Sequence, residues 1–129
     1  ITKQRICIVG DGLSGLMTAV VLAKVPGTEI SLIAKKGTKN VDKRTTAISD
    51  TNYKFINQNI TSLGQKLFWP SKKIELFYET SKEKINFLNL NESKSNLMYV
   101  FENDKVKKVL LKQISKKKIK LIKKKYKKP

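Results

Sequence analysis

The 129-residue sequence predicts an α/β fold in which parallel strands alternate with helices. Three observations lead to this prediction. A short β-branched run ends at a glycine cluster, a segment with helical periodicity follows, and a second apolar run comes within about 33 residues of the start. Hydrophobic residues make up 40% of the chain and charged residues 29%, which is typical of a globular protein. A chain of this length suits one compact domain.

The first half of the chain predicts one βαβ unit. Residues 5–9 (Arg-Ile-Cys-Ile-Val) predict a buried strand because the run is β-branched and ends at a glycine. Residues 13–24 predict a helix, which Pro26-Gly27 ends. Residues 29–33 predict a second strand, parallel to the first.

The middle of the chain predicts a helix and a small antiparallel strand pair. Asp50 is the predicted N-cap of the helix and Gly64 its end. Residues 74–80 and 84–90 alternate roughly between apolar and polar side chains and are joined by a short polar turn. They therefore predict an antiparallel pair.

The last third predicts a strand, a helix and a final strand. Residues 97–101 are apolar, and a helix is expected from Asn103 onwards with one apolar face. Residues 119–122 form a short apolar run among lysines and predict a further strand.

The charge and the rare residue types exclude several chemistries. Lys plus Arg is 28 and Asp plus Glu is 10, for a net charge of +18, and residues 105–129 hold thirteen lysines and no acid. The absence of histidine excludes a Ser-His-Asp triad and a histidine metal site within the chain. The single Cys7 excludes an internal disulfide and a cysteine metal cluster. We therefore expect no metal and a reducing, cytoplasmic compartment, and no catalytic residue is assigned.

The residues Gly10-Asp11-Gly12-Leu13-Ser14-Gly15 match the pattern G-x-G-x-x-G between a predicted strand and a predicted helix. In that context Gly10 permits a tight turn, Gly12 lets the backbone approach a pyrophosphate, and Gly15 lets helix and strand pack closely. The pyrophosphate lies against unpaired N–H groups at the positive end of the helix dipole. The motif thus predicts a dinucleotide site of Rossmann type, and the alternative is a turn that only connects two packed elements.

Two features depart from this pattern. Asp11 brings a carboxylate near a dianionic ligand, which is tolerable only if the side chain points outward. At the end of the second strand the pattern requires Asp or Glu to bind the ribose hydroxyls, yet the residues there are Ile33-Ala34-Lys35-Lys36. Lys35 would suit a ribose that carries a phosphate; otherwise backbone groups alone hold the ribose.

Three stretches carry a resemblance to a known family. Residues 9–15 followed by residues 31–33 resemble the amino-terminal FAD site of flavin-dependent aromatic hydroxylases. Residues 42–49 (Asp-Lys-Arg-Thr-Thr-Ala-Ile-Ser), ahead of a predicted helix and then Phe68-Trp69, are similar to the ubiquinone-biosynthesis branch. Residues 98–103 (Met-Tyr-Val-Phe-Glu-Asn) resemble that branch's strand ending in Glu-Asn before a helix.

The resemblance implies an oxygenation in two steps. NAD(P)H would reduce bound FAD, and dioxygen would then supply the hydroxyl group that is placed on the ring of a polyprenylated phenol. Arg44 would lie against the flavin nucleotide and Asn103 would touch its ribityl chain. The alternatives are that Arg44 is a solvated or structural charge and that Asn103 only caps its helix.

The resemblance covers only the opening part of the family. Its members are longer and carry a later FAD motif and a substrate-facing sheet, neither of which is present in residues 1–129. The chain, which starts at Ile1 rather than methionine, is therefore interpreted as a partial FAD-binding domain that does not hydroxylate a substrate alone.

Two other functions stay open. One is an NAD(P)-binding oxidoreductase domain, which the missing acid after the second strand would suit. The other is a non-enzymatic basic module in which residues 105–129 bind an anionic membrane, at the periphery of the cytoplasmic membrane, or bind nucleic acid. Specific nucleic-acid recognition is not expected, because this segment has no arginine and one aromatic residue, Tyr126. A general bias towards lysine would explain the same residues.

Overall fold

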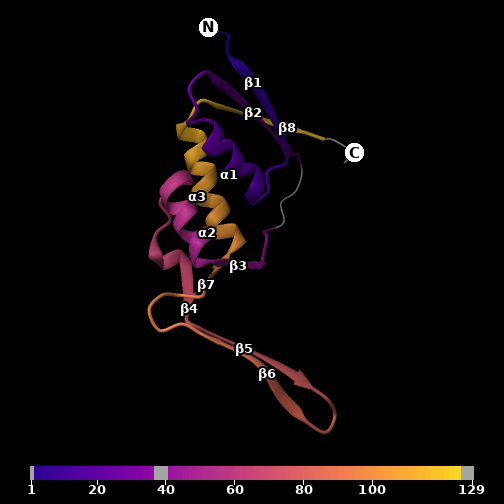
Figure 1. The fold of residues 1–129 in the computed structure, drawn as a ribbon. Coiled ribbons are helices and arrows are strands. Elements are labelled where there is room, and N and C mark those ends of the chain that lie inside the picture. Colours follow the sequence, from indigo (N-terminus) through magenta and orange to yellow (C-terminus); the bar gives the residue numbers. More distant parts are fainter. Residues whose placement is uncertain (1, 37–40, 126–129) are drawn as a thin grey trace.

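The computed structural model describes residues 2–36 and 41–125, which form a mixed α/β fold (Figure 1). A parallel sheet holds β1 (Gln4–Val9), β2 (Thr28–Lys35) and β8 (Ile119–Lys124), with β2 in the centre. Ile6 lies opposite Ile30 and Val9 opposite Ile33, so the first two strands run side by side and parallel. The predicted fold class is confirmed: a Rossmann-like parallel sheet with an additional antiparallel strand pair.

A second sheet of three antiparallel strands follows the βαβ unit in the chain. It consists of β3 (Thr45–Ser49), β7 (Met98–Glu102) and β4 (Phe68–Ser71), with β7 in the centre. Only β7 was expected from the sequence. The flanking strands are short, and β4 contains Pro70, which an edge strand tolerates because one side of its backbone needs no partner.

Helix α1 (Leu13–Leu22) joins β1 to β2, and α3 (Asn103–Lys116) joins β7 to β8. Between the sheets, α2 (Asp50–Phe55) continues into a π-helical turn (Ile56–Ile60), and a short 3₁₀ helix (Gln65–Leu67) precedes β4. The predicted cap of α2 was wrong: Ser49 is the N-cap, and its Oγ accepts a hydrogen bond from the Asn52 N–H at 3.2 Å. Because β3 leads straight into α2, the last extended residue of the strand takes the capping position.

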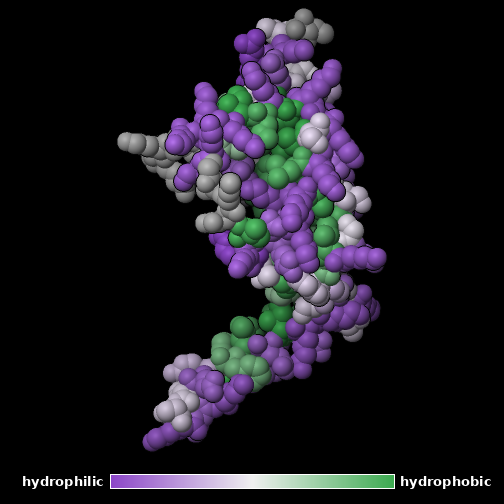
Figure 2. Space-filling model, turned by 180° about the vertical axis from the view of Figure 1, so that it is seen from behind, coloured by the Kyte–Doolittle hydropathy of each residue, from purple (hydrophilic) through white to green (hydrophobic). Residues whose placement is uncertain are grey.

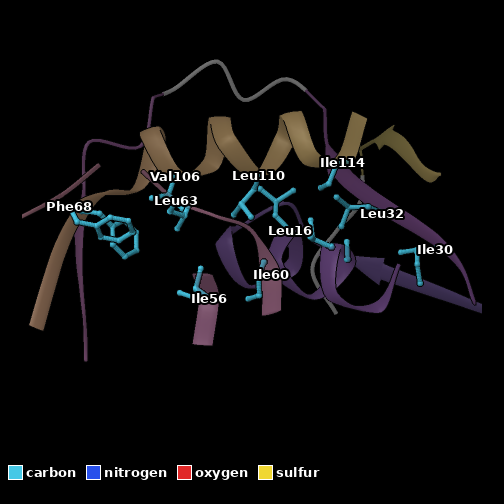
Figure 3. Close-up of a cluster of buried hydrophobic side chains, with 13 residues drawn as sticks. Leu16, Ile30, Leu32, Ile56, Ile60, Leu63, Phe68, Val106, Leu110 and Ile114 are labelled. Atoms are coloured by element: carbon cyan, nitrogen blue, oxygen red, sulfur yellow. The ribbon is translucent and has the colours of Figure 1, made fainter. Parts of the chain in front are cut away.

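Both long helices contribute to one buried cluster with β2 (Figure 3). Leu16 of α1, Leu32 of β2 and Leu110 of α3 are completely buried. The predicted apolar face of α3 is confirmed, since its inward residues are Val106, Leu110 and Ile114. The prediction of a buried first strand was only half right: Ile6 and Ile8 pack against the cluster, whereas Val9 is 60% exposed. Helix α1 packs against β1 and β2, and α3 packs against α1.

Strands β5 (Lys73–Glu79) and β6 (Lys84–Asn91) form the predicted antiparallel pair as a long arm that extends away from the helices (Figure 1). The arm carries apolar surface on view in Figure 2. Its large apolar side chains with at least 40% exposure are Leu76, Phe77, Tyr78, Ile85, Phe87, Leu88 and Leu90. Within the part of the chain that the structure describes, no helix is both long and apolar enough to cross a bilayer.

Candidate functional site

The glycine turn between β1 and α1 has the geometry that its sequence demands. Gly10 has φ +119°, a conformation that other residues rarely adopt, and its N–H donates to the Ile33 carbonyl oxygen at 2.9 Å. A Cβ atom at Gly15 would overlap the carbonyl oxygen of Gly10, so α1 lies directly against the turn. Gly12, by contrast, has open space where a Cβ would point. Gly10 therefore permits the turn, Gly15 permits the close approach of the helix to the turn, and Gly12 leaves its side of the turn open.

The amino end of α1 is not closed by side chains. Gly12 is the N-cap and makes no side-chain capping bond, and the first turn contains no acidic residue. The first N–H groups of a helix lack partners within the helix and carry its partial positive charge. This end of α1 therefore offers donors to an anion.

A hollow of about 260 Å³ lies in front of these donors. Three separate parts of the chain line it: the start of α1, the segment before β3, and the first turns of α3. The lining residues are Gly12, Leu13, Ser14, Asp42, Arg44, Asn103 and Lys107. Five residues predicted from the sequence therefore lie together around this hollow: Gly12, Leu13, Ser14, Arg44 and Asn103.

Arg44 is paired with Asp42 at the rim of this hollow. Its Nε donates to Asp42 Oδ1 at 2.8 Å and its Nη2 donates to Asp42 Oδ2 at 2.9 Å. These bonds, with those from the Arg44 backbone N–H and from Asn103, hold the pKa of Asp42 well below its usual range. The same pairing raises the pKa of Arg44. Both groups therefore carry full charge near neutral pH.

Asn103 is the first residue of α3, and the residue is 8% exposed. Its Oδ1 accepts from Thr46 Oγ1 at 2.5 Å, and its Nδ2 donates to Asp42 Oδ2 at 3.2 Å. The alternative that Asn103 caps its own helix is wrong, because Glu102 occupies the N-cap position and makes no side-chain capping bond. Asn103 instead ties the start of α3 to β3 and to Asp42.

Lys107 and Asp42 also line the hollow, and neither was predicted from the sequence as a site residue. Lys107 lies one turn after Asn103 on α3, on the same face of the helix. Its Nζ lies 3.4 Å from Asp11 Oδ2. This pairing neutralises the carboxylate that the sequence placed near an anionic ligand. The i, i+4 spacing from Asn103 is the signal that could have pointed to Lys107.

Three nominated residues do not line the hollow: Gly10 and Gly15, which shape the turn behind it, and Lys35. Lys35 is the last residue of β2 and it is exposed. Its neighbours in the sequence are Ala34, which is buried, and Lys36. A role for Lys35 beside a ribose stays a prediction. Among the described residues, no group of three metal-ligating side chains is present.

Comparisons with known proteins bear on the fold. No protein-family model matches the chain. No curated protein matches it either. Among solved structures, peptidyl tryptophan dihydroxylase QhpG, described as essential for tryptophylquinone cofactor biogenesis, aligns with a TM-score of 0.54 at 8% identity. The alignment covers 95% of this chain and 25% of QhpG, so the chain spans about a quarter of the length of that protein. At this identity the likeness shows a shared fold.

Proposed function

We propose that the chain is the amino-terminal FAD-binding part of a flavin-dependent monooxygenase that hydroxylates an aromatic ring, of the ubiquinone-biosynthesis hydroxylase kind. The observation that carries the proposal is the side-chain-free approach to the α1 amino end, flanked by Arg44 and Lys107. The fold shared with QhpG, a dihydroxylase by name, adds support. The family resemblance in the sequence supplies the substrate class, a polyprenylated phenol.

The residues of the hollow fit the diphosphate of FAD. The open position at Gly12 leaves room for a phosphate against the N–H groups of Leu13 and Ser14. Arg44 and Lys107 bring two cationic side chains to the same hollow, and each is paired with a carboxylate, Asp42 and Asp11 respectively. The Asn103 amide offers a neutral polar group beside them, which suits the hydroxyls of a ribityl chain.

When bound, FAD reduced by NAD(P)H supplies the activation of dioxygen. This chain's own contribution is binding and orientation. The helix amino end and Arg44 hold the charged part of the cofactor, and Asn103 fixes the first turn of α3 against β3.

The test compares two glycines with similar backbone geometry. Gly12 has φ −72° and ψ 174°, Gly64 has φ −60° and ψ 144°, and neither has an atom within 4 Å of an added Cβ. Gly12→Val places its side chain at the approach to the α1 amino end. Gly64→Val places the same side chain just before the 3₁₀ helix, outside the lining of the hollow. We expect Gly12→Val to raise the FAD dissociation constant at least tenfold, about 1.4 kcal/mol, without changing the circular dichroism. Gly64→Val should bind FAD as the parent does.

Flavin fluorescence quenching measures both constants. Equal FAD affinity in Gly12→Val and the parent, with unchanged circular dichroism, would refute the site. Failure of the parent chain to bind FAD at all would refute the proposed function.

A nicotinamide dinucleotide is the second candidate ligand, because Lys35 and Lys36 stand where ribose recognition normally requires an acid. Competition distinguishes the two cofactors. If NADPH displaces FAD at lower concentration than FAD displaces NADPH, and Lys35→Glu abolishes only the NADPH effect, the nicotinamide assignment replaces the flavin one. If FAD displaces NADPH at the lower concentration, in the parent and in Lys35→Glu alike, the flavin assignment is supported.

We also propose that an anionic membrane surface is the peripheral partner of the lysine-rich segment. Exposed lysines follow one another on β8 and on the last turn of α3, among them Lys116, Lys120 and Lys123. Each lysine near such a surface contributes about 1 kcal/mol. Co-sedimentation with phosphatidylserine vesicles at low salt, lost at 0.5 M NaCl, is expected. Equal binding to neutral vesicles would contradict it.

A further inference from the structure

The carboxylate of Asp42 has its acceptor positions filled. Oδ1 accepts from the Arg44 Nε at 2.8 Å and from the Arg44 backbone N–H at 3.1 Å. Oδ2 accepts from the Arg44 Nη2 at 2.9 Å and from the Asn103 Nδ2 at 3.2 Å. A carboxylate has about four lone-pair positions, so Asp42 retains no free acceptor for a ligand hydroxyl. Although Asp42 lines the hollow, its carboxylate oxygens bond to Arg44 and Asn103 and not to a ligand.

Arg44 depends on this carboxylate for its orientation. Its side chain is 82% exposed, and Asp42 is its ion-pair partner within the described residues. The bidentate bond uses Nε and one hydrogen of Nη2, which leaves the edge formed by Nη1 and Nη2 open. The base of the side chain is also anchored, because the Asn103 N–H donates to the Arg44 carbonyl oxygen at 3.0 Å. A planar guanidinium held along one edge presents the other edge to an anion.

We propose that Asp42 is a positioning residue of the anion site, which holds the Arg44 guanidinium and the Asn103 amide at the hollow before a ligand arrives. The inference rests on the proposed function, since the ligand is the diphosphate-bearing FAD. Its physical basis is preorganisation: a long exposed side chain loses conformational freedom when it binds, and here that loss is already incurred in the free protein.

The direction in which one substitution changes the FAD affinity distinguishes a positioning role from simple proximity. Asp42→Asn removes a negative charge from a hollow that binds an anion. If Asp42 were only a nearby charge, its removal would strengthen FAD binding, because repulsion would fall. If Asp42 positions Arg44, its removal weakens binding although the hollow becomes more positive.

The matched control is Asp104→Asn. Asp104 is also partly buried, and it pairs with Lys108 at 2.9 Å in the first turns of α3, but it does not line the hollow. At low ionic strength we expect the FAD dissociation constant to rise at least fivefold in Asp42→Asn and to change less than twofold in Asp104→Asn. Equal or tighter binding by Asp42→Asn would overturn the inference.

A double-mutant cycle tests whether Asp42 acts through Arg44. In the Arg44→Ala background, Asp42→Asn should weaken FAD binding less than twofold, because the guanidinium is absent and Asn103 keeps its bond to Thr46. A further fivefold loss in that background would overturn the inference. The ¹H–¹⁵N signal of the Arg44 Nε–H gives a readout without ligand: its hydrogen exchange should accelerate in Asp42→Asn and stay unchanged in Asp104→Asn.

The two proposals fail in different ways. A parent chain that binds no FAD refutes the proposed function and the ligand assigned here. A parent chain that binds FAD, with Asp42→Asn binding equally well, refutes the positioning role alone. An Arg44 Nε–H exchange rate that Asp42→Asn leaves unchanged refutes the positioning role whether or not FAD binds.

Discussion

Replacing Gly15 by alanine tests the close packing of α1 against the glycine turn. The added Cβ would overlap the Gly10 carbonyl oxygen, which is backbone and cannot rotate away, so the helix must shift as a unit. That shift disturbs Leu16 and the other completely buried residues of α1. Overpacking of this kind costs about 1–3 kcal/mol. With a urea m-value of about 2 kcal/mol per M, the unfolding midpoint should fall by about 0.5–1.5 M.

Gly12→Ala is the matched control for that measurement. The backbone at Gly12 lies in the ordinary extended region, and the added Cβ meets no atom within 4 Å. The loss of a favourable N-cap residue and the gain from a stiffer unfolded chain are both small, so we expect a change within about 0.5 kcal/mol. Urea unfolding followed by circular dichroism measures both variants. A Gly15→Ala protein as stable as the Gly12→Ala protein would refute the argument from close approach.

Three further predictions concern stability. Leu110→Ala should lower the free energy of unfolding by about 2–5 kcal/mol because the side chain is completely buried, while Leu110→Met should cost less than about 1.5 kcal/mol in the same urea experiment. Lys24→Met should cost about 1 kcal/mol, since Lys24 Nζ donates to two carbonyl oxygens, at 2.6 and 2.9 Å, at the end of the π-helical turn. Lys54 lowers the pKa of Asp50 below its ordinary value of 3.8, so stability from this pair is present above that value and lost as the pH falls through the folded pKa. When the pH is lowered from about 4 to about 2, Asp50→Asn should therefore lose less of its free energy of unfolding than the parent does.

Much of the fold was predictable because its signals are local. The β-branched run before Gly10 and the spacing of the glycines specify a strand, a turn and a helix within 22 residues. The apolar face of α3 repeats at helical spacing and is buried as expected. Five of the seven residues around the hollow were nominated from these patterns and from the family resemblance. Such features depend only on residues that are close together in the sequence.

Other features were not predictable because they depend on partners distant in the chain. Strand β3 is short and polar at both ends, and it is a strand because β7 supplies its hydrogen bonds. Asp42 looks in sequence like one more charge in a polar loop. Its part in the hollow arises because the start of α3, 61 residues later, brings the Asn103 amide to it.

The sequence by itself determined the glycine turn and the open amino end of α1, since backbone torsion and the absence of a Cβ are properties of the residues at those positions. Tertiary structure alone decided what faces that end. The packing of α1 against α3 in one buried cluster sets Lys107 beside Asp11 and gathers Arg44, Asp42 and Asn103 at the hollow. Side-chain contacts of this kind depend on where two elements meet in space, and no local period of the sequence encodes that position.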